Sequence, residues 1–128
     1  MKTIYNNILD SIKSKEKLLA VLIDPDKMKI DNLSFFCEKL NNSITTHVFV
    51  GGSTVDDNVM DDYINEIKNH INLPVVIFPG DVSQISNQAD AILFLALISG
   101  RNPEYLIEKQ VQSVSKLKNS GLEIIPTG

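Results

Sequence analysis

Residues 18–27 read LLAVLIDPDK, in which six consecutive apolar residues are followed at once by a polar turn that begins at Asp24 and Pro25. An apolar run without alternation is typical of a strand buried on both faces, as in a parallel sheet covered by helices. Proline lacks an amide N–H and disfavours helical backbone in the residue before it. We therefore expect Asp24 to be held in an extended conformation where the first strand ends.

Further apolar runs along the chain end in the same way. Residues 48–50 lead into Gly-Gly-Ser-Thr, residues 75–78 into Pro-Gly-Asp, and residues 91–98 into Ser-Gly-Arg-Asn-Pro. A fifth run, 122–125, is followed only by Pro-Thr-Gly. In a parallel sheet the carboxyl ends of the strands lie together on one rim, and α/β proteins bind their ligands at that rim.

The segments between these runs carry apolar residues at a period of about 3.6, which predicts helices. We expect a leading helix through Ile4, Ile8 and Ile12, and a second helix over 33–40 with Asp31 as its N-cap. A third is expected over 60–71, a short one over 82–87, and a last one that begins at Asn102 and stops before Gly121. The predicted order is α(βα)4β.

Two architectures fit this order: an open five-stranded parallel sheet and a partial (βα)8 barrel. The last strand has no helix after it to cover it, and a complete barrel takes about 250 residues. The 128 residues are therefore interpreted as one α/β domain, 1–128, that corresponds to the N-terminal half of a TIM barrel.

Composition narrows the function classes. The 16 acidic and 12 basic residues give a net charge of −4, so the composition does not predict a basic surface that would bind nucleic acid. A single cysteine, Cys37, excludes an internal disulfide and a cysteine metal cluster, and its place on an apolar helix stripe favours core packing. We expect a cytoplasmic protein. The longest apolar run, 91–98, is far shorter than the roughly 20 residues of a transmembrane helix, so a membrane link would need a lipid substrate or a surface contact.

The residues best placed for chemistry follow the first two strands. One carboxylate, Asp24, and one hydroxyl, Ser53, would suit Mg2+, which keeps several waters and takes its other oxygens from substrate phosphates. Gly51, Gly52, Ser53 and Thr54 also have the composition of a small anion-binding nest, and Asn102 at a helix start could face a diphosphate. Simpler roles stay open: Asp24 as the cap of a turn, Ser53 and Asn102 as helix caps, and the glycines as a tight turn.

Six motifs together resemble one family. They are LIDPDK at 22–27, FVGGST at 49–54, IFPG at 77–80, ADAILF at 89–94, SGRNPEY at 99–105 and GLEIIPTG at 121–128. In order and spacing they are similar to the geranylgeranylglyceryl phosphate synthases and their heptaprenyl relatives. The resemblance implies a TIM-barrel prenyltransferase that joins a prenyl diphosphate to the C3 hydroxyl of sn-glycerol 1-phosphate. It implies Mg2+ as the cofactor, bound by Asp24 and Ser53.

The resemblance also implies an apolar barrel interior that holds the prenyl chain and excludes water. We expect its lining among strand residues whose simpler role is ordinary core: Val21, Ile23, Val48, Val50, Ile77, Leu93 and Leu95. The second half of the family's barrel, where TIM barrels commonly bind phosphate, has no counterpart in these residues. We therefore expect the 128-residue chain to be inactive alone.

Two other functions stay open. An open half-barrel exposes strand edges and an apolar face, which predicts a homo-oligomer and allows a non-catalytic assembly module. The other alternative is a different phosphate-binding βα-barrel enzyme such as an aldolase. Such an aldolase would need a Schiff-base lysine on a strand, and none of the strand runs contains one.

Overall fold

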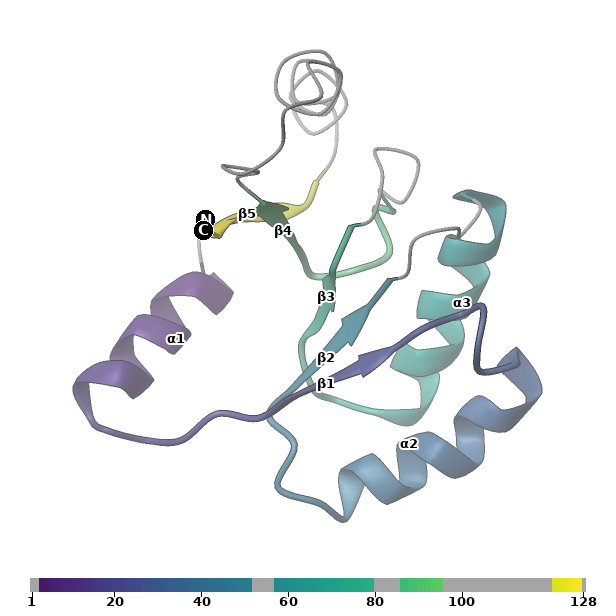
Figure 1. Cartoon of the computed structure of the whole chain (residues 1–128), viewed down its shortest axis with the longest axis horizontal. Helices are drawn as coiled ribbons and strands as arrows, with labels where there is room; N and C mark the ends of the chain where they lie inside the picture. The colour runs from purple at the N-terminus through teal and green to yellow at the C-terminus, as the bar shows by residue number, and fades with distance from the viewer. Residues whose placement is uncertain (1–2, 52–56, 80–85, 96–120, 128) are drawn as a thin grey trace.

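Five parallel strands lie side by side in the order in which they occur in the chain (Figure 1). The computed structural model describes residues 3–51, 57–79, 86–95 and 121–127. The strands are β1 (Ala20–Ile23), β2 (His47–Val50), β3 (Val75–Ile77), β4 (Ala91–Leu95) and β5 (Glu123–Thr127). Sequential order distinguishes the two predicted architectures, because an open doubly wound sheet reverses its strand order at a switch point. The order β1-β2-β3-β4-β5 is that of a barrel wall, which confirms the partial-barrel prediction.

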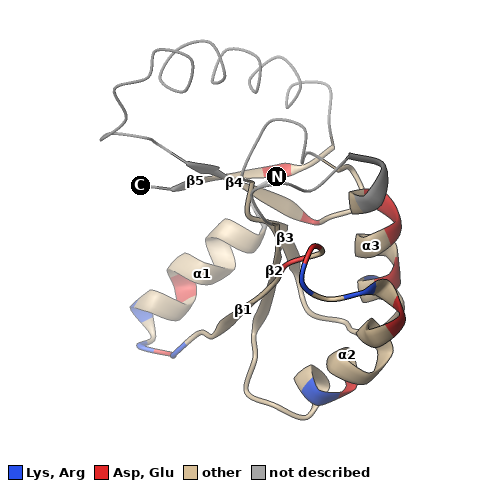
Figure 2. Ribbon diagram, turned by 45° about the vertical axis from the view of Figure 1, so that its right-hand side comes forward, with Lys and Arg blue, Asp and Glu red and all other residues tan. Residues whose placement is uncertain are grey.

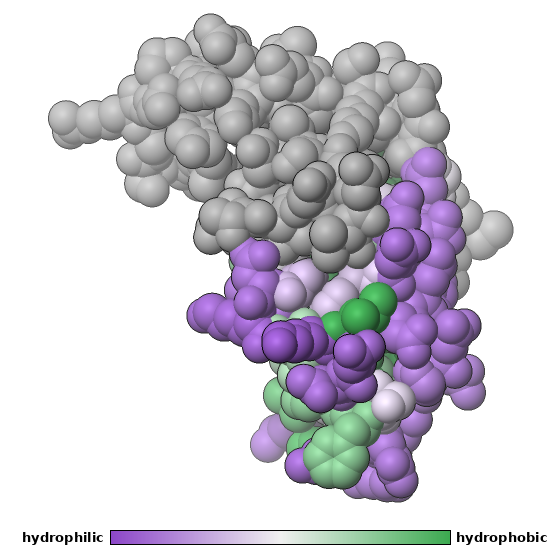
Figure 3. Space-filling view, turned by 90° about the vertical axis from the view of Figure 1, so that its right-hand side faces the viewer, coloured by the Kyte–Doolittle hydropathy of each residue, from purple (hydrophilic) through white to green (hydrophobic). Residues whose placement is uncertain are grey.

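Two helices cover one face of this sheet (Figures 1 and 2). They are α2 (Leu33–Asn41) and α3 (Asp57–His70), and they pack against each other as well as against the strands. The solvent side of α3 carries acidic residues (Figure 2), among them the exposed Asp61 and Asp62. This side of the molecule is mainly hydrophilic, interrupted by apolar side chains (Figure 3).

The helix predictions are confirmed in position and corrected in detail. α1 spans Thr3–Lys13, and α2 and α3 lie where the apolar period placed them. The predicted cap Asp31 is wrong: it lies in a short 3-10 helix, Ile30–Asn32, and the residue before α2 is Asn32, whose side chain makes no capping hydrogen bond. The last predicted helix and residues 82–85 lie outside the described residues, and residues 86 and 87 are not helical.

The core lies between the sheet and the two covering helices. Paired residues in neighbouring parallel strands share a face, and the rows Val21–Val48–Val75 and Ile23–Val50–Ile77 both point toward the helices. They pack there with fully buried helix residues, including Leu33, Cys37, Met60, Ile64 and Ile67. The prediction that Cys37 is a core residue is therefore confirmed.

This packing corrects the predicted lining of the barrel interior. Val21, Ile23, Val48, Val50 and Ile77 belong to the core beneath the helices, so the interior assignment is wrong for these residues. Leu93 does face the interior, and the side chain of Leu95 lies outside the described residues.

The residues that do face the interior occupy the alternate positions of these strands, between the residues that face the helices. The row Leu22–Phe49–Val76 points to this side and continues in a small cluster with Ala91, Leu93 and Ile125. The long apolar runs hid the alternation, because both faces of each strand carry aliphatic side chains.

α1 is hydrogen-bonded to β5, the last strand of the sheet. The carboxylate of Glu123, at the start of β5, accepts hydrogen bonds from the amide groups of Ile4 at 2.9 Å and Tyr5 at 2.7 Å. Ile4 and Tyr5 also pack on the interior cluster of the sheet. The first amides of a helix have no partner within the helix, and a negative charge is favourable at that end. Glu123 thus caps α1 from a strand 118 residues away.

Replacing Glu123 by Gln is expected to loosen α1. The amide oxygen of Gln can accept one of the two hydrogen bonds but carries no charge, so about 1–2 kcal/mol of local stability should be lost. Hydrogen exchange of the α1 amides, followed by mass spectrometry, should become several-fold faster. The control is Glu38→Gln on the exposed side of α2, and equal α1 protection in both variants would contradict the assigned role.

Candidate functional site

The carboxyl ends of the first three strands form one continuous edge. Gly51, just after β2, donates its amide to the carbonyl of Ile23 at 3.2 Å, and Phe78, just after β3, donates to the carbonyl of Val50 at 2.9 Å. Asp24 follows Ile23 directly. The backbone therefore brings the ends of β1, β2 and β3 together where sequence analysis placed the site.

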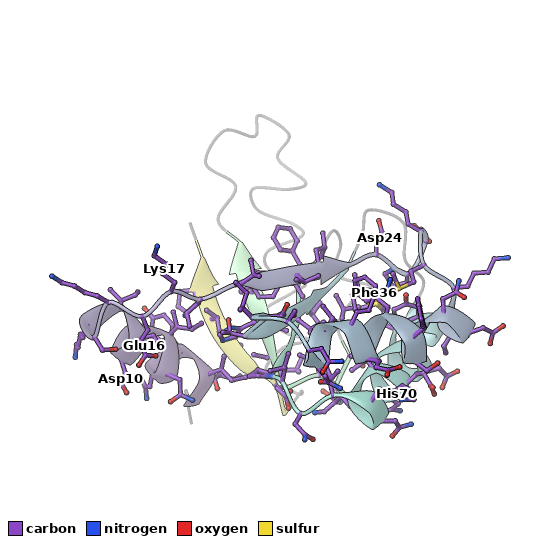
Figure 4. All side chains as sticks on the ribbon, turned by 90° about the horizontal axis from the view of Figure 1, so that it is seen from below. Asp10, Glu16, Lys17, Asp24, Phe36 and His70 are labelled. Atoms are coloured by element: carbon purple, nitrogen blue, oxygen red, sulfur yellow. The ribbon has the colours of Figure 1, made fainter. Side chains whose placement is uncertain are left out.

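Asp24 organises the turn that leaves β1. Its Oδ1 accepts a hydrogen bond from the amide of Asp26 at 2.9 Å, and its carbonyl accepts from Lys27 at 2.9 Å and Met28 at 3.0 Å. The simpler expectation, that Asp24 caps a turn, is thus confirmed. The carboxylate nevertheless has a second oxygen, Oδ2, with no hydrogen-bond partner among the described residues. Figure 4 shows this side chain beyond the end of β1, pointing away from α2.

A hydrogen bond from a side chain of α3 also holds this turn. The hydroxyl of Tyr63 donates a hydrogen bond of 2.6 Å to the carbonyl of Met28, and the tyrosine side chain is almost completely buried. Burial, with smaller contributions from the charges of Asp24 and Cys37, raises the pKa of Tyr63 to about 12. The hydroxyl therefore stays protonated at neutral pH and remains a donor.

Gly51 is required by a close approach of backbone to backbone. A Cβ atom placed on Gly51 would lie 1.9 Å from the carbonyl oxygen of Phe78 and 2.9 Å from its carbonyl carbon. Real Cβ atoms do not occupy such positions, so only glycine fits between β1 and β3 at this point. This observation gives the first of the two adjacent glycines a structural role.

Several predicted site residues cannot be placed. Gly52, Ser53, Thr54 and Asn102 lie outside the described residues, so Asp24 is the one predicted site residue with a described position. Within the described ranges no three His, Cys, Asp or Glu side chains gather in a way that could hold a metal ion. A lone carboxylate with an uncommitted oxygen still fits Mg2+, which binds through one or two carboxylates together with waters and substrate phosphates.

Three further titratable side chains have structural contacts. Burial lowers the pKa of His47, whose Nδ1 lies 2.8 Å from the hydroxyl of Thr46. His70 pairs with Glu66 one turn earlier on α3 at 2.8 Å. Burial, and then the charge of Glu66, raises the pKa of the Cys37 thiol, which opposes a role as nucleophile. These contacts give His47 and His70 structural roles, and the core interpretation of Cys37 stands.

Two residues of the site were not predicted from sequence. Tyr63 lies within the helix predicted over 60–71 and its ring packs in the core, but its hydroxyl also donates the hydrogen bond to Met28. The available signal was chemical: a buried tyrosine hydroxyl normally needs a hydrogen-bond partner. Gly51 was noted only as part of a Gly-Gly pair, and its contact with Phe78 depends on tertiary structure.

A sequential parallel sheet, with its helix-covered core on one face and a carboxylate at the end of its first strand, defines a protein of the (βα)-barrel class. The described strands supply five of the eight that such a barrel contains. The chain belongs to the PcrB family, whose sequence profile matches residues 10–128.

Curated relatives agree with this assignment. The chain is 55% identical over 128 residues to the geranylgeranylglyceryl phosphate synthase of Flavobacterium johnsoniae, covering 100% of this chain and 53% of the relative. It is 54% identical over the same length to the synthase of the same name from Zunongwangia profunda, of which it covers 54%. The chain thus spans about half the length of the curated relatives it matches.

Solved structures confirm the fold. The chain superimposes with a TM-score of 0.89 on (S)-3-O-geranylgeranylglyceryl phosphate synthase from Thermoplasma acidophilum in complex with its substrate sn-glycerol-1-phosphate, at 34% identity. That match covers 98% of this chain and 51% of the other. The wild-type enzyme from Thermoplasma volcanium gives a TM-score of 0.82 at 35% identity, covering 93% and 49%. The predicted half-barrel and the family resemblance are both confirmed.

Proposed function

We propose that this chain supplies the first half of a Mg2+-dependent prenyltransferase of membrane ether-lipid synthesis. The reaction joins a prenyl diphosphate, geranylgeranyl or similar, to sn-glycerol 1-phosphate. The observation that carries the proposal is the 55% identity, over all 128 residues, to a protein named geranylgeranylglyceryl phosphate synthase. The position of Asp24 at the rim supports it, because that is where a barrel enzyme binds the reacting groups.

The chemistry breaks one bond and forms one. The bond between C1 of the prenyl group and the diphosphate oxygen breaks, the C3 hydroxyl oxygen of the glycerol phosphate bonds to C1, and the hydroxyl proton is released. Mg2+, when bound, would neutralise the charge that builds on the departing diphosphate. In this proposal Asp24 supplies the carboxylate oxygen that holds the ion, and Ser53 supplies a hydroxyl.

The interior face of the sheet suits the prenyl chain. Leu22 is 54% exposed on β1, and Phe78 is 40% exposed at the end of β3 with its ring 6.3 Å from that of Phe49. These side chains offer apolar contact next to the rim on which Asp24 lies. An apolar wall there would exclude water from the cation-like C1 and so favour attack by the glycerol hydroxyl.

The test is a comparison of the 128-residue chain with a hybrid protein. The hybrid carries residues 1–128 of this chain, followed by the part of the F. johnsoniae relative beyond the matched stretch. We expect turnover of prenyl diphosphate and sn-glycerol 1-phosphate by the hybrid, loss of that turnover on chelation of Mg2+, and no turnover by the chain alone. A correctly folded hybrid without transferase activity would contradict the proposed function.

The partners and location follow from the same proposal. We propose that the protein works in the cytoplasm as a homo-oligomer and meets the membrane only peripherally, through its lipid substrate. No helix among the described residues is long and apolar enough to cross a membrane. Sedimentation of the hybrid, expected to give a mass above that of a monomer, tests the oligomer.

A further inference from the structure

The turn that carries Asp24 is closed by its own backbone amides. Asp26 and Lys27 are exposed, and the amides of Asp26, Lys27 and Met28 donate hydrogen bonds back to Asp24. These hydrogen bonds fix the internal shape of the turn. By themselves they do not fix the direction in which the whole turn, and with it the Asp24 carboxylate, leaves the sheet.

A hydrogen bond from the helix layer beneath the sheet acts on this direction. Tyr63 lies on α3, is 2% exposed and belongs to the core under the sheet, so its own position is well determined. Its hydroxyl reaches up to the carbonyl of Met28, the residue whose amide closes the turn onto the carbonyl of Asp24. The side chain of Met28 packs against the same core. The turn is therefore anchored at its last residue, four positions after Asp24.

We infer that Tyr63 is a positioning residue, whose buried hydroxyl holds the turn from Asp24 to Met28 in the orientation that presents the Asp24 carboxylate at the rim. Tyr63 touches neither metal nor substrate in this role. Its effect passes through the Met28 carbonyl to the Met28 amide and from there to Asp24. The inference rests on the proposed function, because it assigns Asp24 a ligand to bind.

The experiment uses Tyr63→Phe, which removes the hydroxyl and keeps the ring in the core. Its matched control is Ile67→Val, a fully buried residue one turn further along the same helix, whose expected loss of stability is of the same size as that of one hydrogen bond. A variant that acts only by weakening the core should behave like this control. A variant that frees the Asp24 turn should not.

Two measurements separate these outcomes. In the 128-residue chain without metal, we expect Tyr63→Phe to speed hydrogen exchange at Lys27 and Met28 by roughly three- to tenfold, the range that one lost hydrogen bond corresponds to. Ile67→Val should leave these two amides no faster than the rest of the chain. In the hybrid protein, we expect the Mg2+ concentration for half-maximal rate to rise by a similar factor in Tyr63→Phe alone, with kcat at saturating Mg2+ largely retained.

Each other result has a definite meaning. If Tyr63→Phe and Ile67→Val show the same exchange and the same Mg2+ dependence, Tyr63 is only a core residue and the inference is overturned, while the proposed function stands. If Asp24→Asn in the same hybrid leaves the Mg2+ dependence unchanged, the metal role of Asp24 fails instead. Faster exchange in Tyr63→Phe without any change in Mg2+ dependence would also overturn the inference, because the turn would then move without consequence for the site.

Discussion

Asp24→Asn in the hybrid protein is expected to lower kcat by about 100-fold or more. In the proposed mechanism, losing the carboxylate that holds Mg2+ would remove several kcal/mol of stabilisation from a transition state in which negative charge collects on the diphosphate. Each 1.36 kcal/mol corresponds to about tenfold in rate. Asn retains an oxygen that can accept the amide of Asp26, so the turn itself should persist. Steady-state kinetics over a Mg2+ series, together with the thermal midpoint, measure both effects.

A charge change elsewhere provides the comparison. Asp10→Asn removes the same charge from an exposed residue of α1, which Figure 4 shows far from Asp24. This variant should keep the kcat and the Mg2+ dependence of the unchanged hybrid. If Asp24→Asn were equally active, Asp24 would be a turn cap and nothing more.

Gly51→Ala is expected to have the largest effect on stability. The new methyl group would lie 1.9 Å from the carbonyl oxygen of Phe78, and both neighbouring backbones are fixed by the hydrogen bonds Gly51 to Ile23 and Phe78 to Val50. Relief of the clash must separate the ends of β2 and β3, at a cost of about 3 kcal/mol or more. For a chain of this length, that corresponds to a thermal midpoint lowered by roughly 10 °C or more.

The chain contains its own control for this substitution. A Cβ on Gly121 meets no atom within 4 Å, so Gly121→Ala adds the same methyl group in open space. Thermal or urea unfolding of the two variants should therefore differ widely, with Gly121→Ala close to the unchanged protein. Equal midpoints would mean that the edge formed by β2 and β3 is more adaptable than its hydrogen bonds indicate.

The fold was largely predictable because its signal is spread over many residues. Each strand is a local apolar run, and each helix repeats its apolar residues with a period that would remain visible after a few substitutions. The strand runs could not reveal which side chains face the helices, because Val21, Leu22 and Ile23 are all aliphatic. The interior assignment accordingly fell on the wrong alternate positions in β1, β2 and β3, and only the register between strands corrected it.

The site was predictable only where local sequence constrains geometry. Pro25 fixes the backbone around Asp24, and the placement of that carboxylate at the end of β1 was confirmed. The tie from Tyr63 to Met28 joins residues 35 positions apart, and the contact between Gly51 and Phe78 joins two strand ends. Neither contact leaves a local sequence pattern, since one depends on how α3 packs against the sheet and the other on how β3 pairs with β2.

The cap that Glu123 places on α1 also affects the order of events during synthesis. α1 is translated before β5, and the carboxylate that satisfies its leading amides is made 118 residues later. At 5–20 residues per second, the nascent helix waits roughly 6 to 24 s for that partner. Over this interval α1 lacks its cap and is open to proteases and chaperones, although it is translated before all the described strands.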